Sequence, residues 1–176
     1  MRILIFLSKT LTNLFFVFAF TSLAGLGAAY VYFKNQLPQI PGNLRYLNQR
    51  PPTEIYSYDG KILKILGGRS FVTLNLISPN FQKAIIAVED ADFYKHHGVD
   101  HRSLLRAFWV NLKNGKSLQG GSTITQQLAK NLFFSFKKSY ERKLKEILMG
   151  FQIESTFSKE EILEAYANQI YFGRGV

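Results

Sequence analysis

Residues able to do acid and base chemistry gather in one short stretch, where Glu89, Asp90 and Asp92 place three carboxylates within four residues. Like charges this close repel one another, and proteins keep such clusters most readily at working sites. Histidines follow directly along the chain. They allow two interpretations, a metal site or structural histidines held by hydrogen bonds, and the side chains concerned are His96, His97, Asp100 and His101.

The next segment is strongly basic. Between Lys95 and Lys145 there are eleven Lys and Arg side chains against the two acids Asp100 and Glu141, a surplus of nine. Such a surplus repels itself unless a polyanion, an anionic membrane or a phosphorylated ligand offsets it. Nucleic acid, lipid headgroups and a solvated basic face all remain open on charge alone. The chain has a net charge of +10 and no cysteine, which excludes thiol nucleophiles and disulfides.

Two predicted helices collect polar side chains of this basic segment. Thr123, Gln127 and Lys130 stand at i, i+4 and i+7, so they share one helix face. The start of that helix, at Gly120–Ser122, offers free backbone amides that can bind an anion. A second polar group lies on one side of the following helix, where a surface ion pair between its first and last members is the structural alternative; its members are Arg142, Lys143 and Glu146.

The elements that position these residues follow an apolar N-terminus. Thr10–Phe33 is a run of 24 residues without a charge, and about 20 suffice to span a bilayer. Its length favours a retained anchor over a cleaved signal peptide. Arg2 and Lys9 favour a cytoplasmic N-terminus, which would place the bulk of the chain outside the cytoplasm.

After the anchor, the sequence predicts a linker over 35–52 and then a small β region. Four prolines punctuate the linker, and Asp59-Gly60 predicts a hairpin, with a further β-type run at Phe71–Leu76. From Ser78 the pattern is helical. Five helices are expected, at 79–89, 101–113, from a Ser122 cap to about 134, from about 139 to 156, and after a Ser158 capping box with Glu161.

Four motifs, in order, resemble the family 51 glycosyltransferase domain of class A penicillin-binding proteins and monofunctional peptidoglycan transglycosylases. E-D-x-x-F-x-x-H-x-G stands at 89–98, and G-G-S-T-[IL]-T-Q-Q-x-x-K-N is matched without exception at 120–131. R-K-x-x-E begins at Arg142 with Ile153-Glu154 downstream, and the fourth motif spans 162–173. The resemblance covers roughly residues 50–176.

Three departures accompany the resemblance. Gly150 stands where the family usually has Ala, and Ala167 replaces the usual Leu. Members of the family also continue past the last motif, so we expect the domain to be incomplete at its C-terminus. The expected organisation is an anchor at 1–34, a linker at 35–52 and a truncated glycosyltransferase domain at 53–176. The resemblance implies a mainly α, lysozyme-like fold with a small N-terminal β-hairpin region.

The resemblance also implies a reaction, the polymerisation of lipid II into glycan strands. The growing glycan leaves its undecaprenyl pyrophosphate and joins the 4-hydroxyl of the N-acetylglucosamine of lipid II, with inversion. Glu89 would be the general base, and Glu146 would fix the neighbouring cations or hold Mg²⁺ or Mn²⁺ on the pyrophosphate; no cofactor is certain. The expected substrate-binding residues are Asp90, Phe93, His96, Gly121, Ser122, Thr123, Gln127, Lys130, Asn131, Arg142 and Lys143.

The expected partners are lipid II, the growing strand, the bacterial cytoplasmic membrane and other proteins of cell-wall synthesis, without nucleic acid. The expected location is a single-pass protein of the inner membrane with its catalytic domain on the periplasmic face. Two other functions compete. One is an inactive, truncated module that binds lipid II or acts as a scaffold. The other is a membrane-anchored, lysozyme-like muramidase, which would leave the cations Lys130, Arg142 and Lys143 without a phosphate to stabilise.

Overall fold

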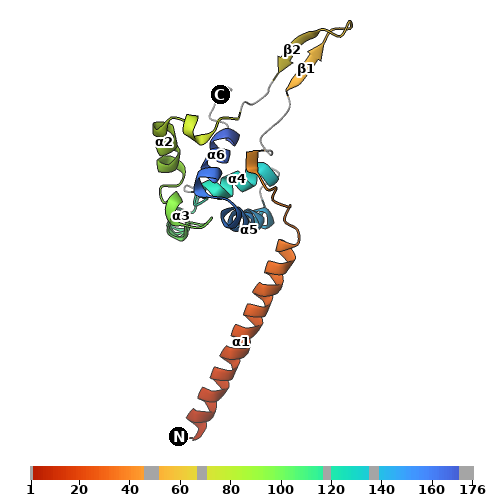
Figure 1. The fold of residues 1–176 in the computed structure, drawn as a ribbon. Helices are drawn as coiled ribbons and strands as arrows, with labels where there is room; N and C mark the ends of the chain where they lie inside the picture. Colours follow the sequence, from red (N-terminus) through yellow and green to blue (C-terminus); the bar gives the residue numbers. More distant parts are fainter. Residues whose placement is uncertain (1, 46–51, 67–70, 117–119, 135–138, 171–176) are drawn as a thin grey trace. The chain divides into compact units, whose positions relative to one another are not determined.

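A computed structural model describes residues 2–45, 52–66, 71–116, 120–134 and 139–170, with side chains from Lys9 onward (Figure 1). The chain divides into two compact units, 1–37 and 38–176. Helices dominate the described part and a single pair of strands is present there, which confirms the predicted mainly α class.

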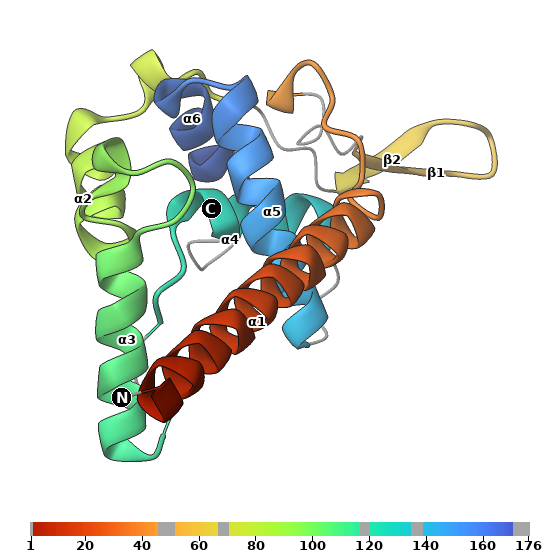
Figure 2. The ribbon, with the colours of Figure 1, turned by 90° about the horizontal axis from the view of Figure 1, so that it is seen from below.

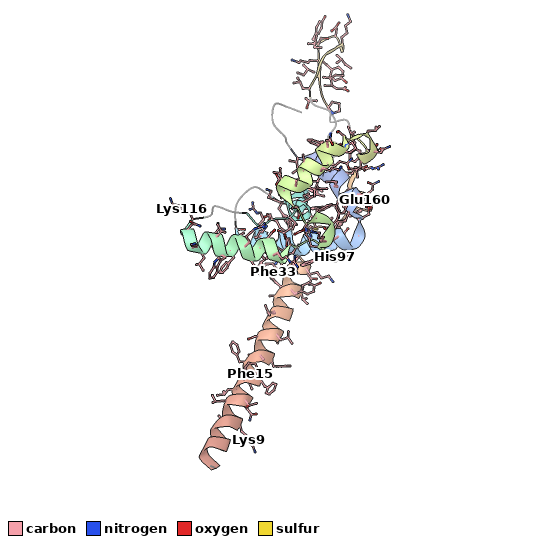
Figure 3. All side chains as sticks on the ribbon, turned by 90° about the vertical axis from the view of Figure 1, so that its left-hand side faces the viewer. Lys9, Phe15, Phe33, His97, Lys116 and Glu160 are labelled. Carbon is pink, nitrogen blue, oxygen red and sulfur yellow. The ribbon has the colours of Figure 1, made fainter. Side chains whose placement is uncertain are left out.

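The first unit contains one long helix, α1 (Arg2–Lys34). Its segment Lys9–Lys34 has a mean hydropathy of 1.9 and is long and apolar enough to cross a membrane. The apolar side chains are exposed along its length, and Figure 3 shows Phe15 projecting from the helix. Contact of such a surface with water is unfavourable in free energy, whereas contact with lipid chains is not. The helix therefore fits the predicted anchor, although a signal peptide of the same composition would form it too.

The predicted hairpin is confirmed as β1 (Thr53–Tyr56) paired antiparallel with β2 (Ile62–Leu66). The turn contains Gly60, whose φ of +81° suits a residue without a side chain. The further β-type run at Phe71–Leu76 was predicted wrongly, because it ends in the 3-10 turn η2 (Leu74–Leu76). Side chains bind the backbone there in place of a neighbouring strand, since Leu74 N donates to Glu164 Oε2 at 2.7 Å.

The five predicted helices are all present in the second unit. They are α2 (Pro79–Glu89), α3 (His101–Asn114), α4 (Ile124–Phe133), α5 (Tyr140–Thr156) and α6 (Lys159–Gln169), with the short turn η3 (Phe93–Lys95) before α3. The capping box of Ser158 and Glu161 forms as predicted. The predicted cap of α4 was wrong by one residue, because Thr123 rather than Ser122 accepts the hydrogen bond from Gln126 N.

The core of the second unit forms where α4 packs against α5 and α6 (Figures 1 and 2). Apolar residues recur along α4 at the spacing of one helix face and are fully buried. They meet apolar side chains of both neighbouring helices, and this shared core consists of Ile124, Leu128, Met149, Ile153, Ile162, Leu163 and Tyr166. Helix α4 is thus packed on two sides, by α5 and by α6, and this packing fixes its position.

A buried ionic group reinforces this packing. Glu154 on α5 accepts a hydrogen bond from Thr125 on α4 at 2.6 Å and pairs with Lys159 on α6 at 2.7 Å. The ammonium of Lys159 also lies 4.4 Å from the ring centre of Phe93, close enough for a cation-π interaction. One carboxylate therefore joins three helices to the loop that follows α2.

The second unit begins inside the predicted linker. Leu44 is 3% exposed, and Arg45 Nε lies 2.8 Å from Glu164 Oε1 on α6. The guanidinium also lies 5.4 Å from the ring centre of Phe71. Residues 38–45 are therefore part of the folded unit, and the ion pair with Glu164 fixes this segment on α6.

Gly150→Ala should stabilise the protein by about 0.5–1 kcal/mol, because glycine is a poor residue for a helix interior. A Cβ at Gly150 would meet Gln126 Cγ and Gly98 O at 3.6 Å, which is ordinary contact. The midpoint of thermal unfolding in detergent measures the change. Gly98→Ala is the matched opposite, since its Cβ would lie 3.0 Å from backbone atoms of Gly150 and its φ is +82°. A lower midpoint for Gly150→Ala would contradict this packing.

Candidate functional site

The carboxylate of Glu89 lies at the last residue of α2 and is exposed. Its Oε2 accepts a hydrogen bond from Gln127 Nε2 at 2.9 Å, so α4 holds it in place. Glu89 lines a cavity of about 300 Å³ between the end of α2, α3 and the segment that leads into α4, together with Asp90, Asp92, Asp100, Ser103, Arg106 and Gly120–Thr123. The first and second sequence motifs therefore meet at one cavity.

Asp90, the residue after α2, is buried and fastens the start of α4. Its Oδ2 accepts from the backbone amide of Ile124 at 3.0 Å, and His96 Nε2 lies 2.9 Å from its Oδ1. A carboxylate at a helix N-terminus is stabilised by the helix dipole. The arrangement gives Asp90 and His96 a supporting position behind Glu89.

Phe93 and Thr123 occupy interior positions too. The ring of Phe93 is fully buried and packs edge-on against Tyr94 and His96. The hydroxyl of Thr123 donates to Gly98 O at 2.7 Å, and its Oγ1 caps α4. Both residues were predicted to bind substrate, but the structure turns their side chains toward the protein. They fix the loop of the first motif against α4.

At the start of α4, two backbone amides are already occupied, and the expected anion site at the amides of Gly120–Ser122 stays a prediction. The amide of Ile124 donates to Asp90 and that of Gln126 donates to Thr123, so the protein itself uses these groups. The residues before the helix also make contacts within the protein: Gly121 packs against α3, and Ser122 Oγ accepts a hydrogen bond from Lys143. A Cβ on Gly121 would lie 3.0 Å from Leu104 Cα, so this glycine lets the segment approach α3.

A cluster of cations forms on the first turns of α5, around a buried acid. Glu146 is 3% exposed; its Oε1 lies 2.9 Å from Arg142 Nε and its Oε2 lies 3.3 Å from Lys143 Nζ. The ion pair between Arg142 and Glu146, given above as the structural alternative, does form, but it is buried and not on the surface. Because the pair is buried, it fixes the guanidinium more firmly than a surface pair would.

Lys143 links this cluster to α4. Its ammonium donates to Ser122 Oγ at 2.8 Å and to Gln126 Oε1 at 3.0 Å. Burial lowers the pKa of Lys143 from its ordinary value of 10.5; Glu146 opposes this, and the charges of Lys130 and Arg142 add to it. Lys130 is therefore close enough to act electrostatically on Lys143, and three cations share one region. Lys130 and Asn131 are half-buried on α4.

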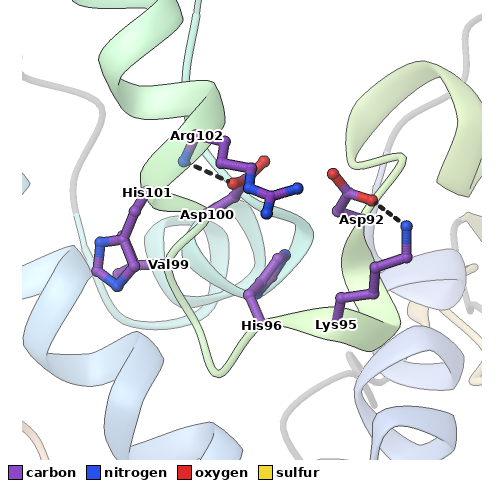
Figure 4. Close-up of a pocket in the computed structure, with 7 residues that line it drawn as sticks. All are labelled: Asp92, Lys95, His96, Val99, Asp100, His101 and Arg102. Atoms are coloured by element: carbon purple, nitrogen blue, oxygen red, sulfur yellow. Dashed lines mark hydrogen bonds and ion pairs between the residues drawn. The ribbon is translucent and has the colours of Figure 1, made fainter.

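A divalent ion does not fit Glu146 in this arrangement, because both carboxylate oxygens already face cations and a further positive charge would be repelled. The histidines lie elsewhere. His96 and His101 line a neighbouring cavity of about 290 Å³ with Lys95 and Arg102, and this cavity shares Asp92 and Asp100 with the cavity of Glu89 (Figure 4). Among the described residues, no three His, Asp or Glu side chains gather as metal ligands. The geometry therefore favours Glu146 as the residue that holds Arg142 and Lys143.

Helix α4 and the residue before Thr123 connect the carboxylate of Glu89 to the cations Lys130 and Lys143. Gln127 binds Glu89, and Lys130 follows it one turn later on the same helix. Ser122 lines the cavity of Glu89 and accepts a hydrogen bond from Lys143. An exposed base on one side and a cationic cluster on the other can remove a proton and stabilise a departing anion at neighbouring positions.

Two residues of this site were given no role by the sequence. Gln126 joins Lys143 to Gly98 O, and Tyr166 on α6 donates to Gln127 Oε1 at 3.1 Å. Tyr166 is only 1% exposed, and a buried hydroxyl on an apolar helix face requires a partner. That requirement was the available signal, although it does not identify the partner.

Comparison with known proteins gives consistent matches. The family model described as Transglycosylase matches residues 59–176. Penicillin-binding protein 1A of Escherichia coli is 44% identical over 155 residues, 86% of this chain and 18% of the relative. Penicillin-binding protein 1A of Rickettsia felis is 40% identical over 176 residues, 93% of this chain and 22% of the relative. The chain thus spans about a fifth of the length of these relatives.

Proposed function

Because the chain belongs to the transglycosylase family, the glycosyltransferase family 51 of class A penicillin-binding proteins, we propose that it is a peptidoglycan glycosyltransferase. The proposed reaction transfers a glycan from undecaprenyl pyrophosphate to the 4-hydroxyl of the N-acetylglucosamine of lipid II, with inversion. The observation that carries the proposal is that α4 and the segment before it bind both Glu89, through Gln127, and Lys143, through Ser122.

Glu89 is the proposed general base. A sugar hydroxyl is a poor nucleophile, so a carboxylate must take its proton as the hydroxyl attacks the anomeric carbon. Glu89 is the exposed carboxylate in its cavity that is held by α4, while Asp90 is buried and already bound to Ile124 N. An exposed, oriented carboxylate can meet an incoming alcohol, whereas Asp90 serves the fold.

The cationic cluster is the proposed site of the leaving group. The bond between the anomeric carbon and the pyrophosphate breaks with negative charge developing on the phosphate oxygens. Lys130, Arg142 and Lys143 can neutralise that charge, and the guanidinium offers two parallel donors. Glu146 keeps the cations from spreading apart, which lowers the reorganisation needed when the charge appears.

The proposed location is the outer face of the bacterial cytoplasmic membrane, with α1 as the anchor. A second feature supports contact with lipid. α3 presents large apolar side chains to the outside, and Figure 2 shows it extending away from α4, α5 and α6. The exposed fractions are 68% for Leu105, 63% for Phe108, 68% for Trp109 and 63% for Leu112. A surface of this kind in a protein whose substrate is a lipid fits the membrane surface.

Trp109 should lie within reach of lipid chains when the full chain is reconstituted in vesicles. It is the only tryptophan of the protein, so its fluorescence reports on α3 alone. Lipids brominated in their acyl chains should quench its emission strongly. Leu105→Asn combined with Leu112→Asn should reduce the quenching severalfold by weakening the apolar face, whereas Leu63→Asn on the exposed β2 should not. Unquenched emission in brominated vesicles would contradict the contact.

Labelled lipid II tests the proposed function against both alternatives. Transfer predicts that polymer appears when the reconstituted chain receives lipid II. A muramidase would instead shorten preformed glycan and form no polymer, and an inactive module would bind lipid II without turnover. Absence of polymer together with shortening of glycan would therefore overturn the proposal. The cations favour transfer, because hydrolysis of a glycan creates no phosphate charge for them to stabilise.

A further inference from the structure

Tyr166 is a buried titratable group that the proposed mechanism does not use. It stands near the middle of α6 and is 1% exposed, with its ring in the core beneath α4. Its hydroxyl donates to Gln127 Oε1 at 3.1 Å. The other end of the same amide donates from Nε2 to Glu89 Oε2 at 2.9 Å. A continuous path of two hydrogen bonds therefore runs from the interior of α6 to the exposed carboxylate.

The path has a direction. An amide presents an oxygen acceptor on one side and an NH₂ donor on the other, and a rotation of 180° exchanges them. Gln127 can hold the carboxylate of Glu89 only while its NH₂ group faces Glu89. A hydroxyl that donates to Oε1 holds the amide in that orientation, because the reversed amide would turn its oxygen toward a carboxylate, which repels it.

The hydroxyl of Tyr166 is well suited to keep its proton. Burial raises the pKa of Tyr166 above its ordinary value of 10.0, and the negative charges of Glu89 and Asp90 raise it further. The phenol therefore remains neutral, and able to donate, at any pH at which the enzyme would work. The same charges place Tyr166 close to the two carboxylates at the end of α2, those of Glu89 and Asp90.

We propose that Tyr166 is a positioning residue for the base Glu89, acting by locking the amide of Gln127. The inference rests on the proposed function, in which Glu89 removes the proton of the acceptor. Tyr166 does not touch the reacting atoms in this role. It reduces the number of orientations that the carboxylate can adopt, and catalysis depends on such orientation.

Tyr166→Phe tests the inference because it removes one oxygen atom and keeps the buried ring. We expect kcat for lipid II polymerisation to fall on the order of tenfold, part of the 10²–10⁴-fold that general base catalysis typically contributes. KM should stay unchanged, because the cationic cluster is intact. Tyr140→Phe is the matched control, since Tyr140 is 94% exposed at the start of α5 and should retain full activity.

A double-mutant cycle separates positioning from a merely structural role. If Tyr166 acts through Gln127, then Tyr166→Phe should cause no further loss in a Gln127→Ala background. Gln127→Asn provides a second variant; it keeps the amide but shortens the side chain, so it should lose kcat as Tyr166→Phe does. Losses that multiply in the double variant, or an unchanged kcat in Tyr166→Phe, would overturn the inference.

The same assays distinguish this inference from the proposed function. Glu89→Gln measured beside the Tyr166 variants reports on the base itself. If Glu89→Gln is inactive while Tyr166→Phe is fully active, only the positioning role fails. If Glu89→Gln retains polymerisation, the assignment of the base fails, and the role of Tyr166 fails with it.

Discussion

Glu89→Gln should abolish polymerisation of lipid II, lowering kcat by about 10²–10⁴-fold, while binding of lipid II remains close to that of the unaltered chain. The substitution keeps the size of the side chain but removes the group that accepts a proton. Gln127 can still reach the new amide oxygen at the place where it now donates to Glu89 Oε2. The substitution leaves Glu146 in place, which holds Arg142 and Lys143, so the pyrophosphate should still be held.

The measurement compares initial rates and lipid II affinity in the same reconstituted preparation. Glu160→Gln is the matched control, because Glu160 is exposed at the start of α6 and its loss of charge is the same. It should leave both quantities unchanged. A Glu89→Gln variant that polymerises lipid II at an ordinary rate would show that another group takes the proton.

The second large effect is expected for Lys130→Ala, which should weaken both binding and turnover, with kcat lowered by about 10²-fold or more. Loss of one group that stabilises charge in a transition state typically has this size. The charge of Lys130 lowers the pKa of Lys143, so the two cations lie close enough to act on the same phosphate charge. Its removal should therefore reduce the attraction for the pyrophosphate before and during bond breaking.

Lys64→Ala removes the same charge from the exposed strand β2 and should alter neither binding nor rate. The two roles are distinguished by binding of lipid II, which Lys130→Ala should weaken and Glu89→Gln should leave unchanged. If both variants lost binding of lipid II to the same extent, the separation into a base and a phosphate site would be wrong.

The helices were predictable because their sequences carry local signals. Ser158 and Glu161 form the predicted capping box, and Pro79 opens α2 as expected. The run at Phe71–Leu76 shows the limit of such signals. Its alternating pattern suits a strand, yet the backbone of Leu74 is bound by Glu164, 90 residues later in the chain. Local periodicity does not report on a partner so distant.

The site shows the same limit at the level of side chains. Glu89 and Lys130 could be singled out by type and spacing, and so could the pair of Arg142 and Glu146. The orientation of the Thr123 side chain could not be predicted. The cap of α4 is Thr123 and not Ser122, and this position turns the hydroxyl of Thr123 toward the interior. The link from Tyr166 to Gln127 likewise depends on how α6 packs against α4, which spacing within one helix does not specify.

The most direct test of the account is the number of undecaprenyl pyrophosphate molecules released for each sugar–sugar bond formed from lipid II. If proton removal by Glu89 is coupled to departure of the pyrophosphate from the anomeric carbon, with the cations stabilising its charge, the unaltered chain should release one pyrophosphate for each bond. Glu89→Gln should form neither product. Sugar bonds cleaved without any release of pyrophosphate, or release that continues in Glu89→Gln, would contradict the account.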